Sequence, residues 1–218
     1  MKEKSILLIG LGRFGRHIAI KLHEMGHQVM AVDRSEARIN AVLPYATNAQ
    51  IGDSTDAEFV SSLGIPNYDA CIVAIGDDFQ SSLETASLLS ELGARKVIAR
   101  ASKGQQEKFL LRNGADEVVY PERDSAERIA VRLSAEHVFN YIELTDEYSI
   151  YEIPPLPHWP GHTVRELDVR NKYRINILAI KRDDELRPMP GADYLFTGDE
   201  HVLALMSKED ARKLLRKI

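Results

Sequence analysis

The chain has 218 residues, a length that fits one large domain or two modest ones. Its composition, 44% hydrophobic and 28% charged, excludes a disordered chain, a collagen-like repeat and a disulfide scaffold. The formal net charge of -5 argues against binding to nucleic acid or to an anionic lipid surface. The single cysteine, Cys71, has no partner for an internal disulfide.

The N-terminal residues and the length of the apolar runs indicate in which cellular compartment the protein lies. The charged residues 2–4 lead directly into a short apolar stretch, which is unlike a signal peptide. Apolar runs end at Gly10 and at Gly76, well short of the roughly 20 residues that cross a bilayer. We therefore expect a cytoplasmic protein without a membrane span.

The first 140 residues alternate short apolar runs with segments of helical periodicity, a pattern typical of βα units around a parallel sheet. Turn and cap residues separate them: Gly26 ends the first helix, Ser35 begins the second and Thr55 the third. We expect an α/β fold, a Rossmann-like doubly wound parallel sheet whose ligand lies at the carboxyl ends of the strands. The predicted strands are 5–9, 28–33, 48–51, 69–75, 96–100 and 117–120.

A longer helical stretch is predicted after Glu122, because Ile129, Leu133, Val138 and Ile142 recur near helical spacing. Its length favours an amphipathic arm that packs on a partner chain, and an ordinary cover helix for the sheet fits equally well.

A proline-rich segment at 154–161 marks a change in composition and begins a second, smaller α+β domain, or the boundary zone before it. We expect domain limits of 1–140, a nucleotide-binding domain with a crossover helix, and 141–218, a regulatory domain. The elements predicted for the second domain are a helix near 163–169, strands at 176–181 and 201–206, a turn-rich segment at 187–198 and a closing helix from 208.

A glycine-rich loop follows the first predicted strand and opens the first helix, with the sequence G-L-G-R-F-G from Gly10 to Gly15. Gly10 permits a tight turn, Gly12 lets the backbone approach a pyrophosphate, and Gly15 lets the helix pack closely on the strand. Asp33 ends the second strand near the spacing at which a carboxylate binds ribose hydroxyls. The combination predicts a dinucleotide or nucleotide site.

Charged residues around this loop discriminate among nucleotides. Asp33 would repel a ribose 2′-phosphate even with Arg34 beside it, which disfavours NADP. Arg13 in the loop, before Phe14, and Arg16 just beyond it add positive charge for more phosphate than a pyrophosphate carries. The pattern favours ADP or ATP over NAD or NADH. The preference is only slight, because arginines on the first turn of a helix can equally point to solvent.

Other predicted strand ends meet at the same edge of the sheet and supply Asp53, Ser54, Ala74, Gly76 and Arg100. Each is a candidate cofactor-binding residue. The alternatives remain open: a helix cap for Asp53, an ordinary turn for Gly76 and a solvated strand end for Arg100.

No catalytic group stands out in the sequence. Cys71 lies inside an apolar strand, and neither His23 with His27 nor His158 with His162 has the further ligands that a zinc site needs. We therefore expect a nucleotide-sensing protein and no enzyme. The alternatives are an NAD(H)-dependent oxidoreductase and an NAD-binding Rossmann module.

These motifs together resemble the RCK (KTN, TrkA-type) regulatory proteins of bacterial Ktr and Trk potassium uptake systems, and most of all the Ktr-type cytosolic gating subunit. The likeness covers nearly the whole chain. The segments that carry it are 10–15, 31–33, 72–76, 113–116 and 121–124 in the first domain and 167–173 and 177–181 in the second.

The resemblance implies a homodimer that assembles into a homo-octameric ring. The ring docks at the inner face of the plasma membrane on a separate potassium-translocating subunit and gates it, with ATP favouring the active ring and ADP the inactive one. By position, Arg13 would contact the terminal phosphates, Arg100 a phosphate, Asp33 the ribose, and Asp53 and Ser54 the adenine side.

Two further ligands follow from the resemblance alone. Glu122 matches a glutamate that binds a divalent cation, magnesium or calcium, beside the nucleotide. The second domain resembles the part that binds cyclic di-AMP at its dimer interface. The candidate residues there are Arg170, Asn176, Ile177, Leu178 and Ala179.

Overall fold

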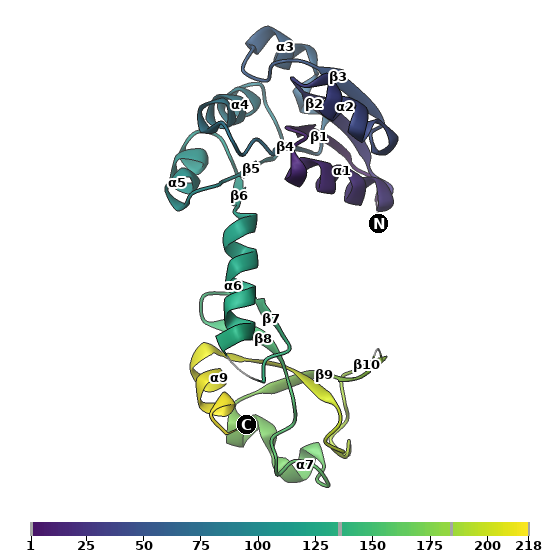
Figure 1. The fold of residues 1–218 in the computed structure, drawn as a ribbon, viewed down its shortest axis with the longest axis vertical. Coiled ribbons are helices and arrows are strands. Elements are labelled where there is room, and N and C mark those ends of the chain that lie inside the picture. The colour runs from purple at the N-terminus through teal and green to yellow at the C-terminus, as the bar shows by residue number, and fades with distance from the viewer. Residues whose placement is uncertain (1, 135–136, 184, 218) are drawn as a thin grey trace. The chain divides into compact units, whose positions relative to one another are not determined.

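The computed structural model describes residues 2–134, 137–183 and 185–217 (Figure 1). The chain forms two compact units, residues 1–122 and 123–218, and helix α6 (Pro121–Ser134) begins in the first and continues into the second. The domain limit after residue 140, inferred from composition, stays a prediction. Among the described residues, no helix is both long and apolar enough to span a bilayer.

The first unit is built on a six-stranded sheet in the order β3-β2-β1-β4-β5-β6, with every neighbouring pair parallel. The predicted doubly wound sheet is therefore confirmed, and its strand order reverses between β1 and β4. The strands are β1 (Ser5–Ile9), β2 (Gln28–Asp33), β3 (Asn48–Ile51), β4 (Ala70–Val73), β5 (Val97–Arg100) and β6 (Glu117–Val119).

Two apolar clusters lie in this unit, one on each face of the sheet. Leu8 and Ala31 pack with residues of α1 and α2, whereas Leu7 and Val73 pack with residues of α3, α4 and α5, as the helix layers in Figure 1 show. Helices on both faces explain why the strands read as continuous apolar runs. These helices are α1 (Arg13–Glu24), α2 (Glu36–Val42), α3 (Ala57–Ser62), α4 (Phe79–Glu91) and α5 (Gly104–Arg112), with 3-10 turns η1 (Leu43–Tyr45) and η2 (Ile65–Asn67).

Capping residues define where these helices begin. The Ser35 side chain accepts a hydrogen bond from the Arg38 N–H, as its predicted role as a cap requires. The prediction that Thr55 begins the third helix is wrong, because the Asp56 carboxylate accepts the N–H groups of Glu58 and Phe59. The carboxylate of Asp56, one position later, therefore has the capping role that was predicted for Thr55.

The helical stretch predicted to reach Ile142 is wrong in its second half. Helix α6 is described over Pro121–Ser134, and Ile142 lies in strand β7 (Asn140–Glu143), which pairs antiparallel with β8 (Tyr148–Ile153). Apolar residues four apart fit a helix, but at this length they also fit a helix followed by a strand with one solvated face. Val138 is buried in the core of the second unit.

The second unit contains a five-stranded antiparallel sheet in the order β10-β9-β11-β8-β7, which confirms the predicted α+β class. Strand β10 occupies Glu185–Pro188, so Arg187 lies in a strand and the turn-rich segment starts later than predicted. The remaining elements are β9 (Asn176–Arg182), β11 (His201–Ser207), α7 (Val164–Leu167), α8 (Val169–Tyr173) and α9 (Lys208–Leu215).

Aromatic side chains fill the core of the second unit. Trp159, the only tryptophan in the chain, is fully buried, and its ring centroid lies 5.0 Å from that of Phe196 and 5.6 Å from that of Tyr173. No residue of this core belongs to the two apolar clusters of the first unit. Each unit therefore has a hydrophobic core of its own.

A buried carboxylate links three strands of the second sheet, β8, β9 and β11. Glu152 on β8 accepts a hydrogen bond from Lys181 Nζ at 3.0 Å and from His201 Nδ1 at 2.9 Å. Burial by itself would raise the pKa of Glu152, but these hydrogen bonds outweigh it and the pKa is lowered. The ionised form therefore stabilises the folded state.

Replacing Glu152 with glutamine is expected to lower the free energy of unfolding by about 1–2 kcal/mol at pH 7. Because the folded pKa is lowered, this stabilisation is complete above the ordinary pKa of about 4.3 and is lost as pH falls through the folded pKa. Urea denaturation from pH 7 to pH 3 should show the two proteins converging at the acid end. A constant difference across that range would contradict the assignment.

Candidate functional site

A cavity of about 750 Å³ opens at the carboxyl ends of the parallel strands of the first unit, where the strand order reverses. Its walls come from the glycine loop, the ends of β2, β4 and β5, and the first residues of α2, α4 and α6. The predicted site residues that line it are Gly10, Gly12, Arg13, Phe14, Asp33, Arg34, Ser54, Ala74, Gly76, Arg100 and Glu122.

The glycine loop has the geometry that its spacing predicts. Gly10 has φ +91°, and a Cβ there would lie 3.0 Å from the backbone carbon of Ala74. Gly15 lies outside the cavity wall, where a Cβ would overlap the carbonyl oxygen of Gly10. Its role is to let α1 pack on β1.

Gly12 precedes α1 and leaves the start of that helix without a side-chain cap. A Cβ at Gly12 would meet no atom within 4 Å, so the space in front of the helix is open to the cavity. Uncapped N–H groups at a helix N-terminus attract anions, and phosphate is the anion that such loops bind.

Asp33 is buried at the end of β2, and both carboxylate oxygens are engaged. Oδ2 accepts the Leu11 N–H at 2.7 Å, Oδ1 accepts the Ser35 N–H at 2.9 Å, and Arg38 Nη1 lies 3.5 Å from Oδ2. An ionised carboxylate has about four lone-pair sites, so it retains capacity for ribose hydroxyls. Its hydrogen bond to Leu11 also fixes the glycine loop against β2.

Arg13 is exposed on the cavity wall and has no ion-pair partner among the residues that the structure describes. Its positive charge is therefore not neutralised by any of the residues described. Arg16, one turn later, is also exposed but does not line the cavity.

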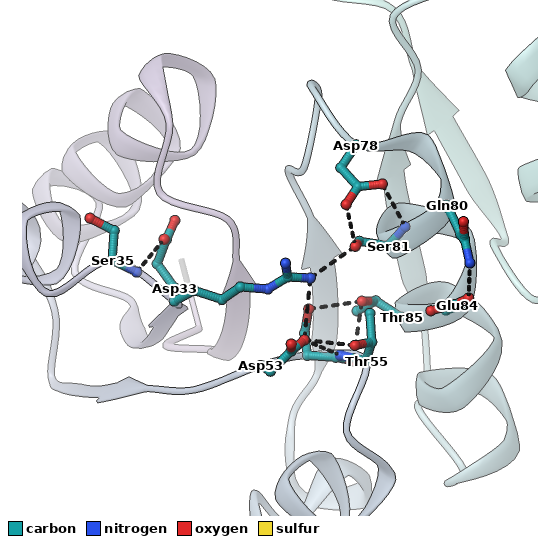
Figure 2. A network of polar contacts seen from close by, with 11 residues as sticks. Asp33, Ser35, Asp53, Thr55, Asp78, Gln80, Ser81, Glu84 and Thr85 are labelled. Carbon is teal, nitrogen blue, oxygen red and sulfur yellow. Dashed lines mark hydrogen bonds and ion pairs between the residues drawn. The ribbon is translucent and has the colours of Figure 1, made fainter.

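Arg34 also lines the cavity and contacts residues of two other segments. Its guanidinium donates to Ser81 Oγ at 2.8 Å and lies 3.3 Å from Asp53 Oδ1, while the Ser81 hydroxyl donates to Asp78 Oδ2 at 2.6 Å (Figure 2). Hydrogen bonds from Ser81 lower the pKa of Asp78 and keep it ionised. Asp78 belongs to the strand end expected at this edge of the sheet and lines the cavity, whereas Ser81, in the first turn of α4, also lines it and was missed.

Asp53 and Ser54 differ in position. Asp53 does not line the cavity: its Oδ1 accepts the backbone N–H and the hydroxyl of Thr55, and these bonds lower its pKa (Figure 2). The alternative that Asp53 caps the third helix is wrong, since Asp56 is the cap. Ser54 is a buried cavity residue that accepts a hydrogen bond from Thr85 at 2.8 Å.

Arg100 at the end of β5 is held by three neighbours. Nη2 forms an ion pair with Glu122 Oε1, the guanidinium carbon lies 5.5 Å from the Phe14 ring centroid, and a Cβ at Gly76 would overlap Nη1. Arg100 Nε is buried and has no hydrogen-bond partner within the described part of the chain. The alternative of a solvated strand end is thus wrong for Arg100, whose side chain is only 18% exposed.

A divalent cation at Glu122 would need ligands besides this carboxylate. Among the described residues, no group of three or more histidine, cysteine or acidic side chains could hold a metal. Magnesium is often bound through one or two carboxylates together with phosphate oxygens and water. Glu122, exposed at the cavity wall, fits that mode if a nucleotide supplies the phosphates.

Within the described chain, no catalytic nucleophile emerges at the cavity. Cys71 is buried in β4, and burial raises its pKa to about 12. The thiol is therefore protonated and enclosed.

The second unit has a cavity of about 490 Å³ between α8, β9 and β11. Arg170 and Asn176 line it, as do Asn171 and Arg174, which the sequence reasoning missed. The other three candidates, Ile177, Leu178 and Ala179, continue along β9 outside the cavity wall.

Comparison with known proteins settles the family. Residues 6–121 match the TrkA-N domain model and residues 148–218 match the TrkA-C domain model. The chain belongs to the TrkA-type (RCK) family of potassium uptake proteins. The resemblance inferred from its motifs is confirmed.

Members of this RCK family match along nearly their whole length. The chain is 39% identical over 216 residues to Ktr system potassium uptake protein C of Bacillus subtilis, covering 99% of this chain and 98% of that protein. It is 39% identical over 213 residues to Ktr system potassium uptake protein A of the same organism, covering 98% and 96%.

A solved RCK structure shares the fold. The GsuK channel bound to NAD superposes with a TM-score of 0.69 at 18% identity, covering 96% of this chain and 38% of that chain. This chain thus spans well under half of the channel polypeptide.

Proposed function

We propose that this chain is the cytoplasmic, nucleotide-sensing regulatory subunit that gates a potassium uptake system. Its full-length relatives are named potassium uptake proteins of the Ktr system, and none of those names denotes an enzyme. The observation that carries the nucleotide part is the cavity itself. It combines an uncapped helix N-terminus at Gly12, an unneutralised Arg13 and an ordered carboxylate at Asp33.

ATP and ADP are the proposed ligands, with NAD or NADH as the second candidate. Arg13 and Arg100 both line the cavity, and the uncapped N-terminus of α1 adds partial positive charge, a set that suits the charged terminal phosphate of ATP or ADP. The NAD-bound neighbour of the same fold supports the second candidate. Asp33, Asp53 and Ser54 would act at the ribose and adenine side, Asp53 through its ion pair with Arg34.

Gating requires that the ligand prefer one of two arrangements of the assembly. A terminal phosphate at Arg13, with a divalent cation at Glu122, provides such a preference for ATP over ADP. In this proposal the chain forms a homodimer, the dimers form an octameric ring, and the ring acts on a separate membrane subunit that translocates potassium. Cyclic di-AMP is proposed as a second ligand, at the cavity lined by Arg170 and Asn176.

A thermal-shift panel of ATP, ADP, NADH and cyclic di-AMP tests the proposal. ATP and ADP are expected to raise the melting temperature in proportion to ln(1 + [L]/Kd), more than NADH does. The control is Gly12→Asp: φ is -63° and a Cβ there meets nothing, so the variant should fold, yet its carboxylate would face the phosphates. Shifts with ATP or ADP that persist in Gly12→Asp, or no shift with any nucleotide, would contradict the proposed site.

A further inference from the structure

The ion pair between Arg100 and Glu122 joins two side chains of very different freedom. Arg100 is 18% exposed and fixed between Phe14, Gly76 and Glu122, whereas the Glu122 side chain is 57% exposed on the first turn of α6. If the pair opens, the glutamate can move into solvent at little cost, while the arginine stays where it is. The pair is therefore a fixed cation with a removable anion.

Arg100 is also incompletely satisfied by its partner. A guanidinium has five N–H donors. Arg100 Nη2 donates to Glu122, and the buried Nε has no acceptor among the described residues. Arg100 belongs to the cavity wall, so an anion with several oxygens bound in the cavity could satisfy donors that one carboxylate leaves unused.

We propose that Glu122 is an intramolecular competitor of phosphate for Arg100 and thereby sets the affinity of the cavity for phosphate-bearing nucleotides. This inference rests on the proposed nucleotide site. An incoming phosphate must displace a carboxylate that already neutralises Arg100. The released carboxylate then stays on the same wall, where it repels the phosphate that replaced it.

Magnitudes favour a measurable but moderate effect. Breaking an ion pair with a half-exposed partner adds little to the free-energy cost of binding phosphate. Repulsion between the released carboxylate and the phosphate adds a further cost. Removing the charge of Glu122 should therefore tighten nucleotide binding about tenfold, which corresponds to roughly 1.4 kcal/mol.

The test is isothermal titration of the full chain with ATP in EDTA, so that no divalent cation contributes. Glu122→Gln is expected to bind ATP about tenfold more tightly than the unmodified chain. Its matched control is Glu117→Gln: Glu117 is also half-exposed and paired, with Lys96, but does not line the cavity. That control should bind ATP unchanged.

The variant Arg100→Gln tests whether Glu122 changes the affinity for ATP through Arg100. In that background the further change Glu122→Gln should give a clearly smaller gain, because the competition for Arg100 is gone and only direct repulsion by Glu122 is left. A gain of the same size would mean general repulsion by Glu122 and would overturn the inference, as would equal or weaker ATP binding by Glu122→Gln alone, the result expected of a pure metal ligand. If neither the unmodified chain nor any variant binds ATP or ADP, the proposed function fails and this inference fails with it.

Discussion

Replacing Arg13 with alanine is expected to weaken ATP binding roughly 10- to 100-fold, the loss typical of a hydrogen-bonded charge pair, and NADH binding by about threefold or less. Arg13 is exposed on the cavity wall and the chain supplies no ion-pair partner for it among the described residues. Its full charge is available to a terminal phosphate, which carries more negative charge than the phosphates inside a dinucleotide. Titration calorimetry with each ligand measures both losses.

Arg16→Ala is the matched control for Arg13→Ala. Arg16 lies one turn further along α1, is also exposed and does not line the cavity, so its removal should leave both affinities within about twofold. Equal losses of ATP and NADH binding in Arg13→Ala would show that the residue contacts an inner phosphate or the loop itself. That outcome would contradict its role at the terminal phosphate.

Phe196→Ala is expected to destabilise the second unit by about 3–5 kcal/mol, the range for removing a buried aromatic ring. Phe196 is 1% exposed and packs on Trp159 and Tyr194, with centroid separations of 5.0 and 5.4 Å. Because Trp159 is the only tryptophan and lies in this core, its fluorescence during urea denaturation follows the second unit alone. The unfolding midpoint should fall sharply.

Phe109→Ala is the control, since Phe109 is half-exposed on α5 in the first unit. It should leave the tryptophan transition unchanged. In Phe196→Ala the nucleotide-induced shift of the first unit should persist, because the two units share no core residue. Loss of nucleotide binding together with the Trp159 transition would refute that independence.

The first unit was largely predictable because its signals are local. Buried parallel strands appear as apolar runs, and Gly10, Gly12 and Gly15 have spacing that only one strand–loop–helix geometry explains. Asp33 follows from the same reasoning. Its hydrogen bond to the Leu11 N–H was not foreseen, because a contact across 22 positions has no local signature.

Predictions from the sequence failed where contacts between distant segments determine the secondary structure or the position of a side chain. Ile142 has the spacing of a helix residue but lies in an edge strand, since pairing of β7 with β8 outweighs local periodicity. Ser81 lies in the first turn of α4, and its contact with Arg34 joins residues 47 positions apart, which no local pattern indicates. The pairing of Arg100 with Glu122 likewise depends on two strand ends that meet only in the folded sheet.

Separate hydrophobic cores in the two units have a consequence for how such a chain can evolve. Substitutions that loosen the aromatic core around Trp159 do not draw on the stability of the sheet that holds Asp33 and the glycine loop. Selection can therefore retune the ligand preference of one unit while the other accumulates neutral change. The sequences of the two units can therefore diverge at different rates within a single gene.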